Sequence, residues 1–403
     1  MPGPLEGVRI IDLTTVLMGP YATVMFGDMG ADVIKVEPPQ GDLVRGLGPA
    51  RHADMGPIFL HANRSKRSIV LDLKQPAGRE ALLRLAGTAD VLFYNVRPQA
   101  MARLGLSYED VAAVNPGIIY AGVFGYGQDG PYAARPAYDD LIQGAACLPT
   151  LYQLAGGHEP RYVPLTMADR VVGLTAFGNI LGALYHRQRT GQGQRIDIPM
   201  FETMASFVLG DHMGGRSFEP PLGKPGYARL LAAARKPFRT SDGYVCVLIY
   251  NDKQWRSFFN AIGQPDKLDK DPRFADLASR TRHIDELYAE IAETIAGRST
   301  EAWLQLLHEA DIPAMPLHDL DSIFDDPHLN ATGFFQTTEH PSEGTLRTMR
   351  YPSTWSQSQP GPTRPTPRCG EHSSEVLREA GYSEAEIARL RADKVTRDAG
   401  EAA

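Results

Sequence analysis

An aspartate at the start of a long apolar helix is the residue of this sequence best placed to do chemistry. Residues 167–188 have a helical pattern, and Asp169 lies at its predicted start, after Pro164 and just before Arg170. Free backbone N–H groups and the positive end of the helix dipole favour an ionised carboxylate at this place. The sequence therefore predicts a ready nucleophile at Asp169. A plain helix-capping aspartate without a catalytic role is the alternative.

Several cations lie next to predicted strands, where they could hold phosphate groups. Arg64, Lys66 and Arg67 come directly before a strand, and Arg97 and Arg103 follow the next one. Guanidinium and ammonium groups are suited to binding phosphate oxygens. For each of these cations, solvated surface charge is the alternative.

Motifs of other enzyme classes are missing. The glycine-rich residues 122–131 follow a strand, which places them at the edge of the sheet where ligands of open α/β folds bind. Their spacing does not match GxGxxG, and the glycines could simply form a turn. The sequence also lacks HExxH, GxSxG, a P-loop and metal-spaced histidines, so it predicts neither a metal site nor those enzymes.

The elements that must position these residues alternate between strands and helices. Gly19 and Pro20 open an apolar segment that ends at Gly30 and fits a helix. Further helices are predicted at residues 76–86, 98–104 and 167–188 and after residue 201, and strands at residues 8–13, 31–36, 68–73, 91–94, 118–123 and 195–199. This alternation predicts an α/β fold with a parallel sheet and right-handed crossovers.

The second half of the chain has a different pattern. Residues 214–236 are irregular and rich in Gly and Pro, which indicates a linker or mobile loop. A second domain is expected beyond it, with a strand at residues 243–250, helices at 255–261, 283–296 and 300–310, and strand-like pieces after Ile312. Residues 352–367 hold five prolines and should run extended, before two short helices at 373–380 and 383–393 that begin with serine caps.

Composition narrows the classes further. A chain of 403 residues exceeds the usual size of one core, so two domains are expected. The net charge of −7 argues against nucleic acid as a partner. Cys147, Cys246 and Cys369 form no CxxC pair, the N-terminal residues do not resemble a signal peptide, and no apolar run is long enough to span a membrane. We therefore expect a cytoplasmic protein that does not bind membranes.

Ordered motifs over most of the chain resemble the superfamily of class III CoA transferases, which includes formyl-CoA and carnitine CoA-transferases and α-methylacyl-CoA racemases. They are residues 5–13, Gly19-Pro20, 30–37, 63–68, 71–74, Asn115-Pro116, Tyr126-Gly127, Ala168-Asp169, 190–194, 240–244 and 312–314. The resemblance implies a Rossmann-like large domain built from both chain ends, a smaller inserted α+β domain, and an interlocked homodimer. The implied parts are residues 1–211, a linker at 212–236, the small domain at 237–312, and a linker and return to the large domain at 313–403.

The resemblance also implies the reaction and its residues. Asp169 matches the aspartate that forms anhydride and thioester intermediates with acyl-CoA, and neither a metal nor a permanent cofactor is implied. CoA thioesters and small carboxylic acids are the implied substrates, and a dicarboxylic acid is our hypothesis among them. The CoA-binding segments of similar enzymes fall on Val16, Leu17 and Met18, on Leu71, Asp72, Leu73 and Lys74, on Asn95, Val96 and Arg97, and on Arg103 and Tyr138.

The sequence departs from the pattern of formyl-CoA transferases at several places. Those enzymes commonly have glutamine where this chain has Leu17 and arginine where it has Pro38, which weakens the case for formyl or oxalyl substrates. Arg45 or Arg51 is predicted to supply the missing charge. Their glycine-rich active-site loop is represented here only by four glycines, at positions 214, 215, 223 and 226.

Two other functions are alternatives. Racemases of the superfamily use a histidine where this chain has Tyr138, and a tyrosine with an ordinary pKa near ~10 is a poor base at neutral pH. The transferase hypothesis is favoured over the racemase for this reason. A CoA-binding protein without turnover is disfavoured by the retained Asp169, and a nucleotide-dependent oxidoreductase by the missing GxGxxG.

Overall fold

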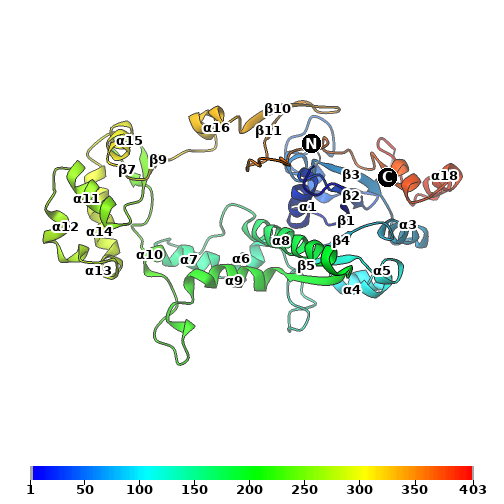
Figure 1. The fold of residues 1–403 in the computed structure, drawn as a ribbon, viewed down its shortest axis with the longest axis horizontal. Helices are drawn as coiled ribbons and strands as arrows, with labels where there is room; N and C mark the ends of the chain where they lie inside the picture. The colour runs from blue at the N-terminus through cyan, green and yellow to red at the C-terminus, as the bar shows by residue number, and fades with distance from the viewer. Residues whose placement is uncertain (1–2, 402–403) are drawn as a thin grey trace. The chain divides into compact units, whose positions relative to one another are not determined.

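The chain forms two compact units, each made of separate stretches of sequence (Figure 1). The structure, a computed structural model, describes residues 3–401. Of the described residues, the first unit holds 3–146, 164–206 and 328–401, and the second holds 147–163 and 207–327. Within residues 3–401, no helix combines the length and the apolar character that crossing a membrane requires.

A six-stranded parallel sheet is the centre of the first unit. Its strands are β1 (Arg9–Leu13), β2 (Asp32–Glu37), β3 (Lys66–Val70), β4 (Val91–Tyr94), β5 (Ile119–Phe124) and β6 (Gln194–Pro199), in the order β3-β2-β1-β4-β5-β6. Strands β1 to β5 are buried almost throughout, as expected when helices cover both faces of a sheet. The predicted mixed α/β class and parallel sheet are confirmed, although β3 lies earlier than the predicted residues 68–73.

Helices connect and cover these strands. They are α1 (Met18–Asp28), α2 (Pro57–Asn63), α3 (Pro76–Ala86), α4 (Pro98–Arg103), α5 (Tyr108–Val114), α6 (Asp139–Ala145) and α8 (Met167–Thr190), and near the C-terminus α17 (Ser373–Glu379) and α18 (Glu384–Ala392). One core cluster joins α3, α5, α17 and α18 to the sheet. Both ends of the chain therefore contribute to this unit.

Local sequence explains most of the helix starts. A proline opens α2, α3 and α4, where the missing N–H costs no hydrogen bond. Ser107 and Ser383 form capping boxes at α5 and α18. The serine cap expected at Ser373 is wrong, because its hydroxyl donates to the carbonyl oxygens of Gly370 and Arg397 and His372 precedes the helix instead.

The second unit combines helices with a small sheet. The antiparallel strands β7 (Phe238–Arg239), β8 (Tyr244–Val247) and β9 (Ala314–Pro316) pair in that order, beside a core rich in aromatic side chains. Its helices are α7 (Leu148–Leu154), α10 (Ala228–Leu231), α11 (Asp252–Ala261), α12 (Lys267–Lys270), α13 (Leu277–Arg282), α14 (Ile284–Ile295) and α15 (Thr300–Glu309). The strand and three helices predicted for the second domain all lie in this unit.

The remaining elements lie near the boundaries of the units or late in the chain. Helices α9 (Met200–His212) and α16 (Pro327–Ala331) each include residues of both units. The antiparallel hairpin of β10 (Phe335–His340) and β11 (Gly344–Met349) belongs to the first unit. Residues 352–367 contain neither helix nor strand, as their prolines predict, and the extended chain passes α1 and β3, where Gly361 N donates to Asp28 and Ser65 N donates to Arg364.

Candidate active site

Asp169 is a buried carboxylate in the first turn of α8. Thr166 precedes the helix, and only 9% of Asp169 is exposed. Its backbone N–H donates to Oδ1 of Asp139, at 2.9 Å, and Oδ2 of Asp139 accepts from Gln143 at 2.6 Å. The first residue of α6 therefore meets the first turn of α8, and two carboxylates come close together.

The electrostatic surroundings of Asp169 differ from the prediction. Burial and the negative charge of Asp139 together raise the pKa of Asp169 to about 7, although the positive charge of Arg170 opposes them. The expectation that the helix start would favour the ionised form is wrong, because one of the free N–H groups is occupied by Asp139 and the loss of water dominates. Asp169 is consequently poised to exchange its proton near neutral pH.

Close packing of α1 on α8 brings Asp169 to the loop after β1. Gly173 lies one turn after Asp169 on the same face of α8, and a Cβ at Gly173 would stand 2.7 Å from the carbonyl oxygen of Met18. No larger residue fits there without separating the helices. The turn that carries Asp169 thus packs beside the predicted CoA-binding residues at the start of α1.

Two neighbouring strand ends hold this loop in an unusual conformation. Asn95, after β4, accepts from Thr15 N at 3.1 Å and donates to Thr15 O at 2.8 Å. Val16 has a φ of +68°, which is rare for a β-branched residue, and its N–H donates to Oδ1 of Asp42 at 3.1 Å. Between β1 and β4 the strand order reverses, and ligands of open α/β sheets bind at such points.

The structure therefore brings together some of the predicted CoA residues. Val16, Leu17, Met18 and Asn95 form one group at the ends of β1 and β4. Near them, Arg97 is exposed and donates to the carbonyl oxygen of Ala134. Val96 is 39% exposed, Arg103 is an exposed residue at the end of α4, and Tyr138 is 69% exposed directly before α6.

The predicted residues after β3 lie beside the C-terminal segment. Leu71 is buried, Asp72 and Leu73 are half-buried, and Lys74 is exposed. Asp72 N donates to the carbonyl oxygen of Val395 at 2.8 Å. These four residues are not joined by a hydrogen bond to the loop after β1 within residues 3–401.

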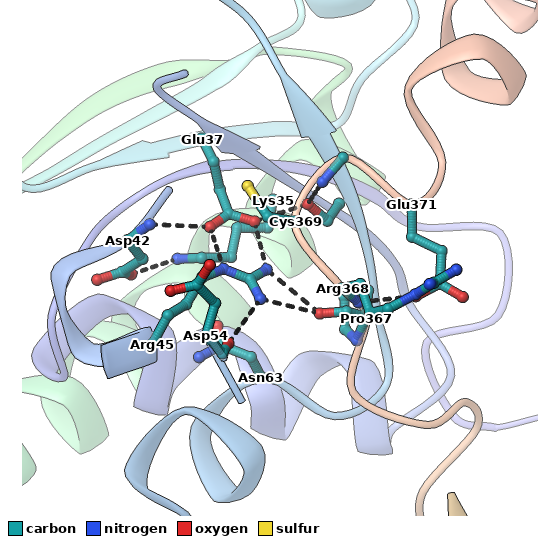
Figure 2. A network of polar contacts seen from close by, with 12 residues as sticks. Lys35, Glu37, Asp42, Arg45, Asp54, Asn63, Pro367, Arg368, Cys369 and Glu371 are labelled. Atoms are coloured by element: carbon teal, nitrogen blue, oxygen red, sulfur yellow. Dashed lines mark hydrogen bonds and ion pairs between the residues drawn. The ribbon is translucent and has the colours of Figure 1, made fainter. Parts of the chain in front are cut away.

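The placement of Arg45 argues against its predicted ligand role (Figure 2). Only 2% of Arg45 is exposed, and its guanidinium donates twice to the Glu37 carboxylate at 2.7 Å and also to the carbonyl oxygen of Pro367. Although burial opposes it, this pairing lowers the pKa of Glu37 to about 2. The other candidate, Arg51, is exposed and donates to the carbonyl oxygen of Glu343.

Arg64, just before β3, and Lys66 and Arg67 in its first residues also face partners inside the protein rather than a phosphate. Arg64 pairs with Asp28 at 2.8 Å, and Arg67 pairs with Asp32 at 2.7 Å and with two glutamates of α17. Lys66 is fully buried and donates to Asp12. Their phosphate role, which was one of two readings of the sequence, finds no support in these contacts.

Sequence reasoning missed the residues that support the loop after β1. Asp42 accepts from Val16 N and pairs with Lys35 at 2.8 Å, and Lys35 also donates to the carbonyl oxygen of Thr14 (Figure 2 shows Lys35 and Asp42). Asp12 accepts from Thr14. Only the presence of charged residues inside strand patterns, such as Asp12 in β1 and Lys35 in β2, signalled this buried network.

Among residues 3–401, no group of three or more His, Cys, Asp or Glu side chains could hold a metal ion. The chemistry of the site rests on a carboxylate of nearly neutral pKa beside a fixed backbone loop. Such a carboxylate can act as a nucleophile or exchange a proton.

Comparisons with known proteins agree with this site. The model of CoA-transferase family III matches residues 5–373. The chain is 34% identical to the succinate–glutarate CoA-transferase of Agrobacterium fabrum, over 93% of this chain and 95% of that one. It is 36% identical to the acetyl-CoA:oxalate CoA-transferase of Acetobacter aceti, over 79% and 82%. The crystal structure of Rv3272 from Mycobacterium tuberculosis matches with a TM-score of 0.79 and 30% identity, over 93% and 99%.

The family model and the two named relatives share one chemistry in their names, and each covers more than three quarters of the chain. They show an enzyme that transfers CoA, of the EC 2.8.3 type. The resemblance found in the sequence motifs is confirmed, and the chain belongs to CoA-transferase family III.

Proposed function

We propose that the protein moves CoA from an acyl-CoA to a carboxylic acid through covalent intermediates on Asp169. The observation that carries the proposal is the buried Asp169 carboxylate, with a pKa of about 7, which lies one helical turn before Gly173, where α8 packs against Met18. A carboxylate that has lost most of its hydration and is ionised near neutral pH is a stronger nucleophile than one on the surface.

The proposed reaction keeps the energy of the thioester through four steps. The Asp169 carboxylate attacks the thioester carbonyl of the donor, which forms a mixed anhydride and releases CoA thiolate. The thiolate attacks the Asp169 carbonyl, giving an aspartyl-CoA thioester and the free donor acid. The acceptor carboxylate attacks this thioester and forms a second anhydride with loss of thiolate. The thiolate then attacks the acceptor carbonyl, which restores the Asp169 carboxylate and releases the new acyl-CoA.

CoA is proposed to lie along the carboxyl ends of the strands. Val16, Leu17 and Met18 would approach it through the loop that Asn95 and Asp42 hold in place. The other proposed contacts come from residues 71–74, from Val96, Arg97 and Arg103, and from Tyr138. The large domain would be Rossmann-like, built from both chain ends.

An interlocked homodimer is part of the proposal. Leu174 and Tyr185 of α8 are 50% and 62% exposed, and nothing lies within 4 Å of a Cβ placed at Gly178 or Gly182. An apolar, open face on a central helix is unusual for a monomer. This exposed face of α8 supports the proposed contact with a second copy.

A small dicarboxylic acid is the proposed acceptor or donor acid. The two relatives described above carry succinate, glutarate and oxalate in their names, and each of these acids has two carboxylates. One carboxylate would react with Asp169, while the other would bind a cation of the site. The proposal would be dropped if only monocarboxylates were accepted.

The first experiment tests transfer directly. The purified protein is incubated in deuterated water with succinyl-CoA, acetyl-CoA or a 2-methylacyl-CoA, each with a mixture of unlabelled acids, and the CoA esters are followed by mass spectrometry. We expect a new ester that matches an added acid. A gain of one mass unit in the 2-methylacyl-CoA without any new ester would establish the racemase instead, and the absence of both reactions would refute the proposal.

The rate of transfer should depend on the ionisation of Asp169. Because its pKa lies at about 7 and the nucleophile is the ionised form, kcat/KM should rise as the pH increases through 7. Asp139→Asn removes the negative charge that raises this pKa while its side-chain oxygen can still accept from Asp169 N. The rising limb should shift to lower pH by roughly half a unit to one unit.

Asp140→Asn is the matched control, because Asp140 is an exposed carboxylate in the same turn of α6. Its pH profile should follow that of the wild type. If the rising limb of the kcat/KM profile lies at the same pH in Asp139→Asn as in the wild type, the titrating group is not Asp169.

A further inference from the structure

A cavity of the first unit lies where β2 and β3 end. Its volume is about 860 Å³. One wall comes from Pro39 after β2 and from the residues after β3, and the other comes from α18 and the chain that follows it. Its lining includes Pro39, Asp72, Gln75, Arg391, Lys394 and Arg397.

The two walls are fixed to each other by hydrogen bonds. Asp72 N donates to Val395 O at 2.8 Å, and the Thr396 hydroxyl donates to Val70 O at 2.7 Å. The Gln75 amide also reaches the carbonyl oxygen of Lys394 at 3.4 Å. The cavity is therefore built into the fold, and its wall after β3 is the segment proposed above to contact CoA.

The cavity is lined by three cations and two acids, and two of the cations are not neutralised by a carboxylate within residues 3–401. Arg391 is neutralised by Asp398 and Glu401. Within residues 3–401, neither Lys394 nor Arg397 pairs with a carboxylate. The guanidinium of Arg397 is held at the cavity wall, because it donates to the carbonyl oxygens of Pro39, at 3.0 and 3.2 Å, and Glu401, at 3.1 Å, and to the Cys369 sulfur. Its positive charge is therefore fixed in place but not neutralised. The acid on the opposite wall, Asp72, already accepts from Lys74 N and Gln75. An anion is the ligand that this arrangement favours in a chain of net charge −7.

The backbone conformation of Lys394 also supports a binding role for this residue. Lys394 follows the end of α18 with a φ of +55°, a conformation that glycine adopts without steric strain and lysine does not. Its side chain is exposed and makes no hydrogen bond or ion pair within the described residues. Lysine at this position therefore costs stability that a glycine would not.

We propose that this cavity binds the phosphate monoester on the ribose of CoA, through Lys394 and Arg397. The inference rests on the proposed function and extends its CoA site to the C-terminal segment. Neighbouring strands lie about 4.8 Å apart, so the ends of β3 and β1 are separated by roughly 10 Å. One extended CoA molecule can span this distance, with its thioester near Asp169 and its ribose phosphate in the cavity.

Dephospho-CoA, which lacks only this phosphate, tests the inference. Dissociation constants for CoA and dephospho-CoA are measured by calorimetry with the full-length protein. The wild type should bind CoA more tightly, and Lys394→Ala should weaken CoA binding about tenfold while leaving dephospho-CoA unchanged, because a charged hydrogen bond is lost only with the phosphate. Arg389→Ala is the matched control, since Arg389 is an exposed cation of α18 that does not line the cavity.

A second variant separates binding from folding. Lys394→Gly should weaken CoA binding as Lys394→Ala does, yet raise the thermal midpoint by about 1–2 °C, because the strain of the left-handed conformation is relieved. A purely structural role of Lys394 cannot produce both effects together.

The possible results separate this inference from the proposed function. Equal affinities of the wild type for the two ligands, or an equal loss of both in Lys394→Ala, would overturn the phosphate site while CoA binding and transfer stand. A wild type that binds neither ligand would overturn the proposed function as well. A loss confined to CoA in both Lys394 variants, with Arg389→Ala unchanged, would establish the site.

Discussion

Replacing Asp169 with asparagine should abolish CoA transfer, with kcat at least about 10⁴-fold lower than in the wild type. An amide has nearly the same shape as the carboxylate but cannot attack the donor thioester, so neither anhydride nor aspartyl-CoA thioester can form. CoA affinity should change little, because the loop after β1 is held by Asn95 and Asp42 and not by Asp169. Initial rates of acyl-CoA formation and CoA dissociation constants measure the two effects.

The same substitution should change stability in a pH-dependent way. The folded-state pKa of Asp169, about 7, is above the ordinary value of 3.8, so the folded protein binds more protons than the unfolded chain between these values. The free energy of unfolding therefore decreases as the pH rises from 3.8 to about 7. Above pH 7, the protein bears the full energetic cost of ionising the buried Asp169. Asp169→Asn removes the cost and should stabilise the protein by about 2–4 kcal/mol at pH 8.5, with little gain at pH 4.

Denaturant unfolding at both pH values measures this difference, and Asp140→Asn serves again as the exposed control. If the Asp169→Asn variant still transfers CoA, Asp169 is not the nucleophile. Suppose instead that the variant is inactive but has the same stability as the wild type at both pH values. Asp169 would then still be the nucleophile, but its raised pKa in the folded protein would be contradicted.

The sheet and its long helix were predictable because their signals are local. The apolar runs that form β1, β2, β4 and β5 are buried on both faces, and the helical pattern from Met167 continues until a glycine with positive φ ends α8. Short helices such as α2, α6 and α7, of seven residues each, were missed. Their positions depend on packing rather than on propensity.

The charge state of the site could not be predicted in the same way. A helix start favours a carboxylate, and this local effect was visible in the sequence, but the burial of Asp169 and the approach of Asp139 depend on a contact across 30 residues. Likewise, the cations at 64–67 follow a pattern that suits phosphate, yet Arg67 finds its carboxylates more than 300 residues away in α17. Pairing between distant segments decides whether a charge is available to a ligand.

Arg45→Met should destabilise the protein by about 3–5 kcal/mol, the usual effect of leaving a buried charge without its partner. Glu37 is 1% exposed, and its carboxylate is now neutralised by the Arg45 guanidinium (Figure 2). In the variant, this buried negative charge would lie near the carboxylate of Asp42 without that guanidinium. Methionine can preserve much of the packing of Arg45 on the ring of Phe59, which lies 3.7 Å from the guanidinium. The loss should therefore be electrostatic, and urea unfolding at pH 7.5 measures it.

Adding Glu37→Gln to Arg45→Met should recover part of the lost stability, because the unpaired charge is then removed. Arg51→Met is the control, since Arg51 is exposed and, among residues 3–401, donates only to a backbone oxygen; it should cost less than about 1 kcal/mol. The CoA affinity of the folded Arg45→Met protein should equal that of the wild type. If affinity falls while unfolding free energy does not, Arg45 binds the ligand after all, and Glu37 must find another partner when CoA enters.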